Sequence, residues 1–455
     1  MFIEIRNHFA NFTCQVRLQK HNRMKVFGLV LAILAISTIQ EAQGVQQSDK
    51  LLVCYFSSWA HYREDPGHFD VTWIDPTLCT HGIYAYADID TVTWSLMPVD
   101  PWYDLGPSDC GIGECNFDSY RRFTSLASET FTPMLSVGGY TEGPQKFSDM
   151  ARDPVKRQAF IDGSVDYLQR YGFKGLDIDW EFPGEDDKRN LDLLVGEMKA
   201  AFDLNGLVLS LAIFPEYDRV DLGYDIPFLS ENADFLSIIS YDFHSYYNGH
   251  EFTAHDAPLF RINEEEDVMH PGYGYNVYDG IRYLLQKGGD PAKLLMGIPA
   301  YGNGFMLEDA SNNGLYCPAA GSINPGPIMH DSGSWSFQEI LKIQQDDSLS
   351  YLPGATPKAW TVVRDDCQRV PYMVNGKYWI GYEDVQSVGL KAQMANALNL
   401  GGVMMYSVDM DDFNGDYSAT RYPLLKEINT QLFSGNSFNP IDETCGTKPA
   451  PVCEI

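Results

Sequence analysis

Short runs rich in β-branched and aromatic residues recur along the chain, and helix-like stretches follow most of them. Two of these stretches, residues 155–172 and 188–206, repeat their apolar positions at the spacing of one helix face. Strands that alternate with helices predict a parallel sheet. The eight predicted strands cover residues 51–57, 81–88, 132–139, 174–182, 207–214, 235–243, 294–302 and 401–409.

Eight such units favour a closed barrel over the alternative, an open doubly wound sheet, because no Gly-x-Gly-x-x-Gly sequence follows the first predicted strand. The gap between the last two predicted strands is too long for one helix. We therefore predict an α/β fold, a (β/α)8 TIM barrel over residues 49–433 with a small α+β insertion at about 303–385, between strand 7 and strand 8. A short cysteine-containing tail, residues 434–455, follows.

The fourth predicted strand, in the stretch FKGLDIDWEFPG, places an acid at every second residue: Asp177, Asp179 and Glu181. Side chains alternate along a strand, so the three acids share one face, with neighbours about 6.6 Å apart. In a barrel this face leads to the C-terminal mouth, where barrel enzymes hold their active sites. Carboxylates crowded there raise one another's pKa, so we expect the two aspartates to keep Glu181 protonated as a general acid.

An exposed edge strand with one acidic face, or a divalent-metal site, would produce a similar pattern. Trp180 and Phe182 disfavour the edge strand. A calcium loop would need glycine and glutamate where the chain has Phe182 and Lys188. From the spacing alone, a catalytic role for the three acids has about even odds against these alternatives.

The N-terminal residues have the pattern of a targeting signal. From Met24, Lys25 precedes an apolar run over residues 26–36 and a small-residue site at 42–44. We interpret residues 24–44 as a signal peptide and 1–23 as an over-extended start, with a long n-region as the alternative. The predicted location is secreted and extracellular, and no later apolar run is long enough to cross a bilayer.

The cysteines agree with secretion. There are nine, and cleavage of the signal would remove Cys14 and leave an even eight. An even number in a secreted chain predicts four disulfides, although sequence alone does not fix the pairing. Proximity favours two small loops, Cys110–Cys115 and Cys445–Cys453.

The chain has 32 Lys and Arg against 62 Asp and Glu, a formal charge of -30. Such a surface repels phosphate backbones and anionic lipids, so neither nucleic acid nor a membrane is an expected partner. Neutral or cationic ligands fit better, although solubility is the simpler explanation of the charge. No sequence motif implies a metal or organic cofactor, and we expect a monomer.

The stretch GLDIDWEFP resembles the Asp-x-x-Asp-x-Asp-x-Glu signature of glycoside hydrolase family 18, the retaining chitinases. The resemblance extends over about residues 50–432 and is to the secreted animal branch, which carries an α+β insertion after strand seven. It implies disulfides between Cys54 and Cys79 and between Cys317 and Cys367. The other similar segments are CYFSSWAHYR (54–63), SVGG (136–139), YDFH (241–244), GIPAYGNGF (297–305) and GGVMMYSVDMDDF (401–413).

The resemblance also implies a mechanism in which the N-acetyl oxygen of the substrate is the nucleophile. Glu181 would be the general acid and base, and Asp179 would turn between Asp177 and the substrate acetamide. Tyr241 would hydrogen-bond the acetamide oxygen. The implied substrate-binding residues are Tyr55, Tyr86, Gly138, Gly139, Tyr140, Asp242, Tyr301 and Tyr406.

The chain departs from the family pattern at several positions. Lys174 replaces the first aspartate of the signature, where it either pairs with Asp177 or extends out of the barrel floor. Asn303 replaces an arginine. Tyrosines stand where relatives usually carry tryptophan, which offers a larger stacking surface for a sugar ring: Tyr140, Tyr247 and Tyr406.

These observations predict a secreted chitinase that hydrolyses β-1,4-linked N-acetylglucosamine polymers, with chitin or chitooligosaccharides as its partners. The alternative is a chitinase-like lectin or growth-factor-type protein that binds the oligosaccharides without cutting them. Lys174 and the tyrosine replacements favour that alternative, whereas the retained acids favour the enzyme. An endo-N-acetylglucosaminidase acting on glycoproteins shares the mechanism but fits the segment order less well.

Overall fold

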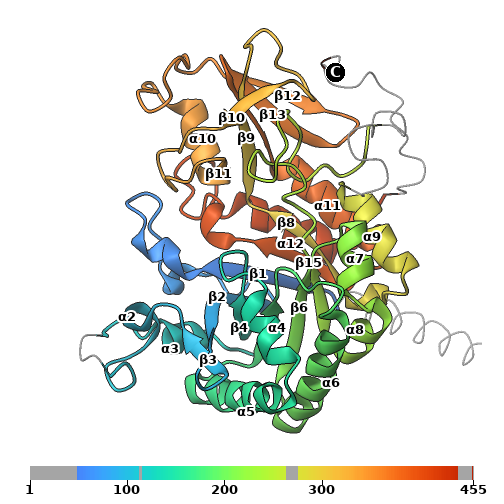
Figure 1. The fold of residues 1–455 in the computed structure, drawn as a ribbon. Helices are drawn as coiled ribbons and strands as arrows, with labels where there is room; N and C mark the ends of the chain where they lie inside the picture. The colour runs from blue at the N-terminus through green and yellow to red at the C-terminus, as the bar shows by residue number, and fades with distance from the viewer. Residues whose placement is uncertain (1–48, 112–114, 263–274, 439–452, 454–455) are drawn as a thin grey trace, which may run out of the picture. The chain divides into compact units, whose positions relative to one another are not determined.

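The computed structural model describes residues 49–111, 115–262, 275–438 and 453 (Figure 1). The chain divides into two compact units, Met1–Lys50 and Leu51–Ile455, and the fold described below is that of the second unit. The predicted signal peptide, the residues before it and Cys14 lie outside the described residues. Cys445, in the predicted tail, also lies outside them.

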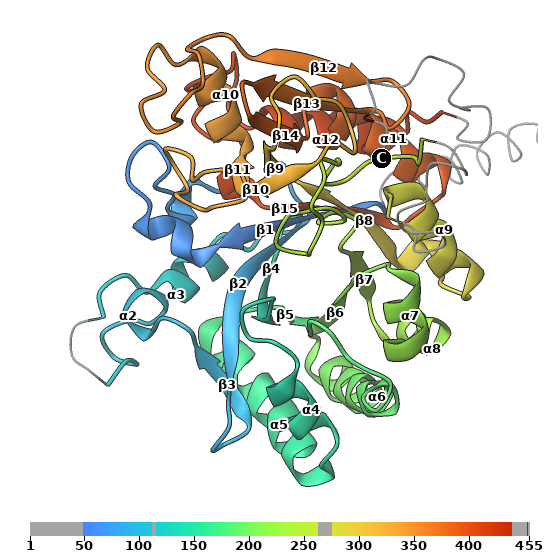
Figure 2. The ribbon, with the colours of Figure 1, turned by 45° about the horizontal axis from the view of Figure 1, so that its top comes forward.

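Eight parallel strands close into a barrel, which confirms the predicted (β/α)8 fold (Figure 2). Closure comes from the first strand, which pairs with both the second and the last. One further strand, β3 (Ser95–Pro98), pairs antiparallel with the end of β2. The barrel strands are β1 (Leu51–Ser57), β2 (His81–Asp90), β4 (Thr132–Gly138), β5 (Gly175–Asp179), β6 (Val208–Ile213), β7 (Phe235–Ile238), β8 (Leu294–Pro299) and β15 (Gly402–Tyr406).

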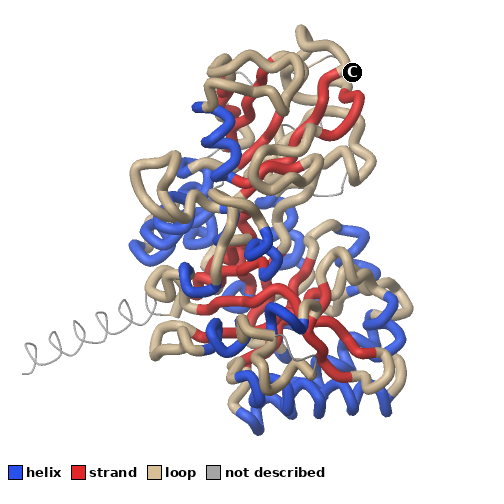
Figure 3. Tube along the Cα trace, turned by 90° about the vertical axis from the view of Figure 1, so that its left-hand side faces the viewer, coloured by secondary structure: helices blue, strands red, loops and turns tan. Residues whose placement is uncertain are grey.

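Helices cover the outside of the strands (Figure 3). In the described part of the chain, no helix is both long and apolar enough to cross a membrane. The helices between or beside barrel strands are α2 (Pro101–Asp104), α3 (Ser119–Thr124), α4 (Gln145–Ala151), α5 (Pro154–Tyr171), α6 (Lys188–Asn205), α7 (Tyr217–Gly223), α8 (Ile226–Asn232), α9 (Val277–Gln286), α11 (Val385–Ala397) and α12 (Pro423–Ser434). Short 3-10 helices cover Ser58–Tyr62, Val71–Trp73, Pro291–Lys293 and Val408–Met410.

The helix α5 illustrates how local sequence sets these boundaries. Its first turn is capped by Asp153, whose side chain accepts hydrogen bonds from the backbone N–H groups of Val155 and Lys156. It ends at Gly172, whose φ of 86° is the left-handed conformation that glycine adopts without a Cβ penalty.

The apolar face of β5 packs against the helix layer, as its alternation predicts. Leu176 and Ile178 are buried, and the indole of Trp180 stacks on Phe147 of α4, with ring centroids 5.2 Å apart. The acidic side chains therefore point to the opposite side, into the barrel interior and towards its mouth.

The inserted α+β region lies between β8 and β15 and forms a second sheet with the strand order β10-β9-β14-β13-β12. A single residue, Ala300, separates β8 from β9, so the insertion begins directly at the mouth of the barrel. Its elements are β9 (Tyr301–Leu307), β10 (Ala319–Ser322), β11 (Ser334–Ser336), α10 (Phe337–Gln345), β12 (Thr361–Asp365), β13 (Val370–Asn375) and β14 (Tyr378–Tyr382).

A buried ion pair joins the end of the insertion to α11. The Lys391 ammonium contacts the Glu383 carboxylate and donates a hydrogen bond to the Ala257 carbonyl at 2.6 Å. Lys391 is 0% exposed and Glu383 3% exposed. The segment around Ala257 therefore meets residues 383–391, which are distant from it in sequence, at one charged contact.

The disulfides agree with two of the predicted pairs, Cys54–Cys79 and Cys110–Cys115. The predicted Cys317–Cys367 pair is wrong, because Cys317 is bonded to Cys453, with Cα atoms 5.0 Å apart.

The predicted Cys445–Cys453 loop is wrong for the same reason. The backbone N–H of Cys453 donates to the Leu315 carbonyl at 2.9 Å, which places Cys453 beside the segment that contains Cys317. Cys367 is also held in a disulfide, but not with Cys317.

Candidate active site

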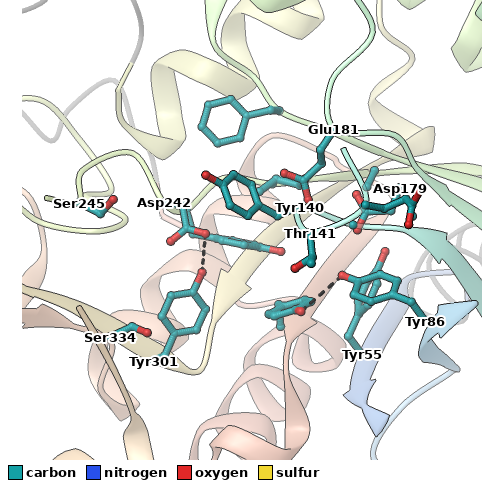
Figure 4. Close-up of a pocket in the computed structure, with 18 of the residues that line it drawn as sticks. Tyr55, Tyr86, Tyr140, Thr141, Asp179, Glu181, Asp242, Ser245, Tyr301 and Ser334 are labelled. Carbon is teal, nitrogen blue, oxygen red and sulfur yellow. Dashed lines mark hydrogen bonds between the residues drawn. The ribbon is translucent and has the colours of Figure 1, made fainter. Parts of the chain in front are cut away.

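A cavity of about 1300 Å³ opens at the C-terminal mouth of the barrel (Figure 4). It brings together all but one of the residues predicted to act in catalysis or substrate binding; Asp177 lies outside its lining. Those in its wall are Tyr55, Tyr86, Gly138, Gly139, Tyr140, Asp179, Glu181, Tyr241, Asp242, Tyr301 and Tyr406.

Asp177 is fully buried and accepts three hydroxyl hydrogen bonds. The donors are Tyr55 on β1 at 2.7 Å, Ser136 on β4 at 2.8 Å and Ser210 on β6 at 2.7 Å. Burial raises the pKa of Asp177, and the three hydroxyls counteract that rise. This network fixes Asp177 in one orientation.

Lys174 does not pair with Asp177, so that alternative of the prediction is wrong. The two residues are three positions apart, which places their side chains on opposite faces of the chain. Lys174 is exposed just before the start of β5, and its backbone N–H donates to the Pro133 carbonyl at 2.8 Å. The second alternative, a lysine that extends away from the barrel floor, matches this exposure.

Asp179 is only 4% exposed, and its Oδ1 has no hydrogen-bond partner within the described residues. Burial and the charges of Glu181 and Asp177 hold its pKa well above the usual range. Because an unpaired buried carboxylate oxygen is costly, Oδ1 is an acceptor available to a ligand N–H.

Glu181 follows the end of β5 and lines the cavity. Burial, with the negative charge of Asp242 as the next cause, raises its pKa to about 7, against the opposing effects of Arg219 and the Tyr140 N–H. The prediction that the two aspartates keep Glu181 protonated therefore needs correction. The neighbouring charge comes from Asp242, in the segment that follows a different strand, whereas repulsion between Asp179 and Glu181 raises the pKa of Asp179.

Two glycines allow β4 to pass close to the acids. Gly138 and Gly139 have φ of 110° and 86°, and the Gly139 N–H donates to the Asp179 carbonyl at 2.8 Å. A Cβ on Gly138 would lie 2.2 Å from the Asp179 carbonyl oxygen, and one on Gly139 would meet the Tyr86 ring at 2.9 Å. Any side chain here would displace the wall of the cavity.

Tyrosines form much of the floor and rim. The Tyr241 ring lies 6.1 Å from that of Tyr301 and 6.1 Å from that of Tyr406, and the Tyr86 hydroxyl lies 3.4 Å from that of Tyr406. Tyr140 is 77% exposed, so its ring is free to stack on a ligand. The floor is therefore preformed and the rim is open.

Sequence reasoning missed two residues of this site. Trp59, 41% exposed, stacks on Tyr86 with ring centroids 6.0 Å apart. An aromatic residue two positions after the first strand is a signal that could have identified it. Arg219 of α7 places its guanidinium 4.1 Å from the centre of the Phe182 ring, and no motif marked it. Among the described residues, no group of three or more His, Cys, Asp or Glu is arranged to hold a metal.

Comparison with known proteins places this geometry in a family. The model for glycosyl hydrolases family 18 matches residues 51–411. Probable chitinase 10 of Drosophila melanogaster is 33% identical over 410 residues, which are 88% of this chain but only 17% of that protein.

Solved structures are similar over most of the chain. The Ostrinia furnacalis group IV chitinase in complex with allosamidin has a TM-score of 0.78 and 34% identity, covering 86% of this chain and 100% of that one. Human YKL-39, described as a pseudo-chitinase with retained chitooligosaccharide binding, has a TM-score of 0.73 and 31% identity, covering 84% and 99%.

Proposed function

The chain belongs to family 18 of the glycosyl hydrolases, and from this premise we propose that it is a chitinase. It would hydrolyse β-1,4 linkages in N-acetylglucosamine polymers with retention of configuration. The observation that carries the proposal is a glutamate with a pKa of about 7 in a large cavity, next to a buried aspartate with an unpaired oxygen.

In this mechanism Glu181 is protonated in the free enzyme and donates its proton to the glycosidic oxygen as that bond breaks. The acetamide oxygen of the substrate attacks the anomeric carbon, and Asp179 Oδ1 accepts the acetamide N–H. The Tyr241 hydroxyl donates to the acetamide oxygen. The Glu181 carboxylate then takes a proton from the water that opens the cyclic intermediate.

A pseudo-chitinase that binds chitooligosaccharides without cutting them is the second candidate. The tyrosines on the rim favour it, as does the similarity to human YKL-39. Incubation of the purified protein with tetra-N-acetylchitotetraose separates the two candidates. Release of chitobiose, detected by mass spectrometry, supports the enzyme, and binding without release supports the lectin.

The rate of hydrolysis is expected to decline above about pH 7, the pKa of Glu181. Because burial and Asp242 raise this pKa, the proton stays on Glu181 over a range in which an ordinary glutamate, with a pKa of about 4.3, would have lost it. The measurement is kcat/KM for a fluorogenic chitotriose analogue from about pH 4 to about pH 9, since kcat/KM reports the free enzyme. A decline already complete near pH 5 would contradict the assignment.

Tyr140→Trp is expected to tighten chitooligosaccharide binding by about 0.5–1 kcal/mol, or about two- to fivefold in Kd. The larger ring covers more of the C–H face of a sugar, and Tyr140 is exposed enough to accept it. Titration calorimetry with chitotetraose measures the change. Tyr417→Trp, a half-buried tyrosine outside the cavity lining, is the control and should leave Kd unchanged.

The protein is further proposed to be secreted, to act outside the cell as a monomer and to bind chitin oligosaccharides. Disulfides form and persist in oxidising compartments, and the described residues include three complete pairs.

A further inference from the structure

Asp242, the carboxylate that raises the pKa of Glu181, has a left-handed backbone and accepts hydrogen bonds from the inserted region. Asp242 follows β7 with a φ of 57°, a left-handed conformation that is uncommon outside glycine. Its Oδ2 accepts the Tyr301 hydroxyl at 2.8 Å and its Oδ1 accepts the Asn303 side-chain amide at 2.9 Å. Both donors come from β9, the first strand of the insertion.

A second carboxylate, Asp256, lies behind Asp242 and is 2% exposed. Its Oδ1 accepts the backbone N–H of Asp242 at 2.9 Å and the Asn303 amide at 2.7 Å. One amide group has two hydrogens, so Asn303 bridges the two carboxylates. The bond from the Asp242 N–H to Asp256 also holds the left-handed backbone in place.

No cation bridges this pair within the described residues. The groups that donate to the two carboxylates are a phenol, a side-chain amide and a backbone N–H, all of them neutral. Lys391 acts on Asp256 electrostatically, but its ammonium contacts Glu383 and the Ala257 carbonyl.

A half-buried carboxylate and a buried one with a neutral bridge between them cannot both be ionised at low cost. Burial and the charge of Asp242 hold the pKa of Asp256 well above its usual range, with a further contribution from Glu383. Burial also raises the pKa of Asp242, but hydrogen bonds from Asn303 and Tyr301 counteract it. The proton therefore resides on Asp256, whose Oδ2 is otherwise without a partner, and Asp242 stays ionised.

We propose that Asn303 and Asp256 are positioning residues that keep Asp242 ionised in the cavity wall that it shares with Glu181, and so set the pH at which hydrolysis declines. This inference rests on the proposed function. The other groups that interact with Glu181 are Asp179 at the end of β5, Arg219 on α7, the Tyr140 N–H and the hydroxyls of Tyr224, Tyr241 and Tyr406.

The test removes the bridge with Asn303→Leu, which keeps the side-chain size. Without the amide, the proton that the two carboxylates share moves partly from Asp256 to Asp242. Asp242 is then neutral more of the time, and Glu181 loses its proton at lower pH. The alkaline limb of the kcat/KM profile, which is the decline at high pH, is expected to shift to a pH lower by about 0.5–1 unit. A shift of this size is within the range by which a nearby carboxylate changes a pKa. Adding Asp256→Asn removes the second acid with which Asp242 shares this proton, so Asp242 stays ionised and the double variant should return towards the wild-type limb.

The matched control is Asn375→Leu. Asn375 is a buried asparagine of the same insertion, bonded to the Thr356 backbone and outside the cavity lining, so its loss should leave the limb in place. An unmoved limb in Asn303→Leu overturns the inference, as does an equal shift in the single and double variants. If Asn303→Leu does not fold, Asn303→Ser deletes the same bridge, and no shift there also overturns it.

A second readout separates this inference from the proposed function. Glutamate labelled with carbon-13 in its side-chain carboxyl reports the titration of Glu181 by NMR, with Glu181→Gln giving the assignment. If no form of the protein cuts chitotetraose, the proposed function fails, but a lower Glu181 midpoint in Asn303→Leu still supports the inference. An unchanged midpoint overturns it whatever the activity.

Discussion

Glu181→Gln is expected to lower the rate of hydrolysis of a fluorogenic chitotriose analogue by about 10²–10⁴-fold, the usual contribution of a general acid. Glutamine keeps the shape of the side chain and its place in the cavity but has no proton to give to the leaving oxygen. Binding is expected to persist, because the tyrosine floor and Asp179 are untouched. Calorimetry with chitotetraose should therefore give a Kd close to that of the wild type.

The control for this prediction is Glu185→Gln, which makes the same chemical change at an exposed position four residues further on. It should leave the rate as it is. Equal rates for the wild type and Glu181→Gln would remove the catalytic role of this glutamate, and loss of binding along with rate would indicate a damaged cavity.

Lys391→Met is expected to lower the free energy of unfolding by about 3–5 kcal/mol, the usual cost of removing one partner of a buried ion pair. Methionine fills much of the space, but Glu383 is left without its counter-charge and the Ala257 carbonyl loses a donor. The contact joins the insertion to α11, so the loss affects the joint between the second sheet and the barrel. Chemical denaturation measures the change.

The double variant Lys391→Met/Glu383→Leu should recover most of that loss, because replacing both charges with apolar groups leaves neither one unpaired. Lys426→Met, on the exposed face of α12, is the control and should change stability by less than about 0.5 kcal/mol. A small effect of Lys391→Met alone would mean that water reaches the pair.

The fold was largely predictable because strand and helix periodicities are local. Asp177 and Asp179 could be placed on the interior face from alternation alone, and the buried Trp180 on the other face confirms that alternation. The mouth of the barrel then brings side chains from different strands together, which the fold class implies.

What sequence reasoning missed depends on contacts between distant segments. Asp242 stands 61 residues from Glu181, and nothing local indicates that it supplies the neighbouring charge. The Cys317–Cys453 disulfide joins residues 136 positions apart, with Cys453 beside Leu315, whereas proximity in sequence favoured Cys445 as the partner of Cys453.

The single residue between β8 and β9 has a consequence for protein engineering. Tyr301 and Asn303 belong to the inserted sheet, yet both hold a carboxylate of the cavity. A chimera that exchanged the insertion for that of another hydrolase would therefore also exchange part of the acid–base machinery. The exchanged segment would have to begin after Asn303, so that Tyr301 and Asn303 remain in the same protein as Asp242, the acid to which they donate.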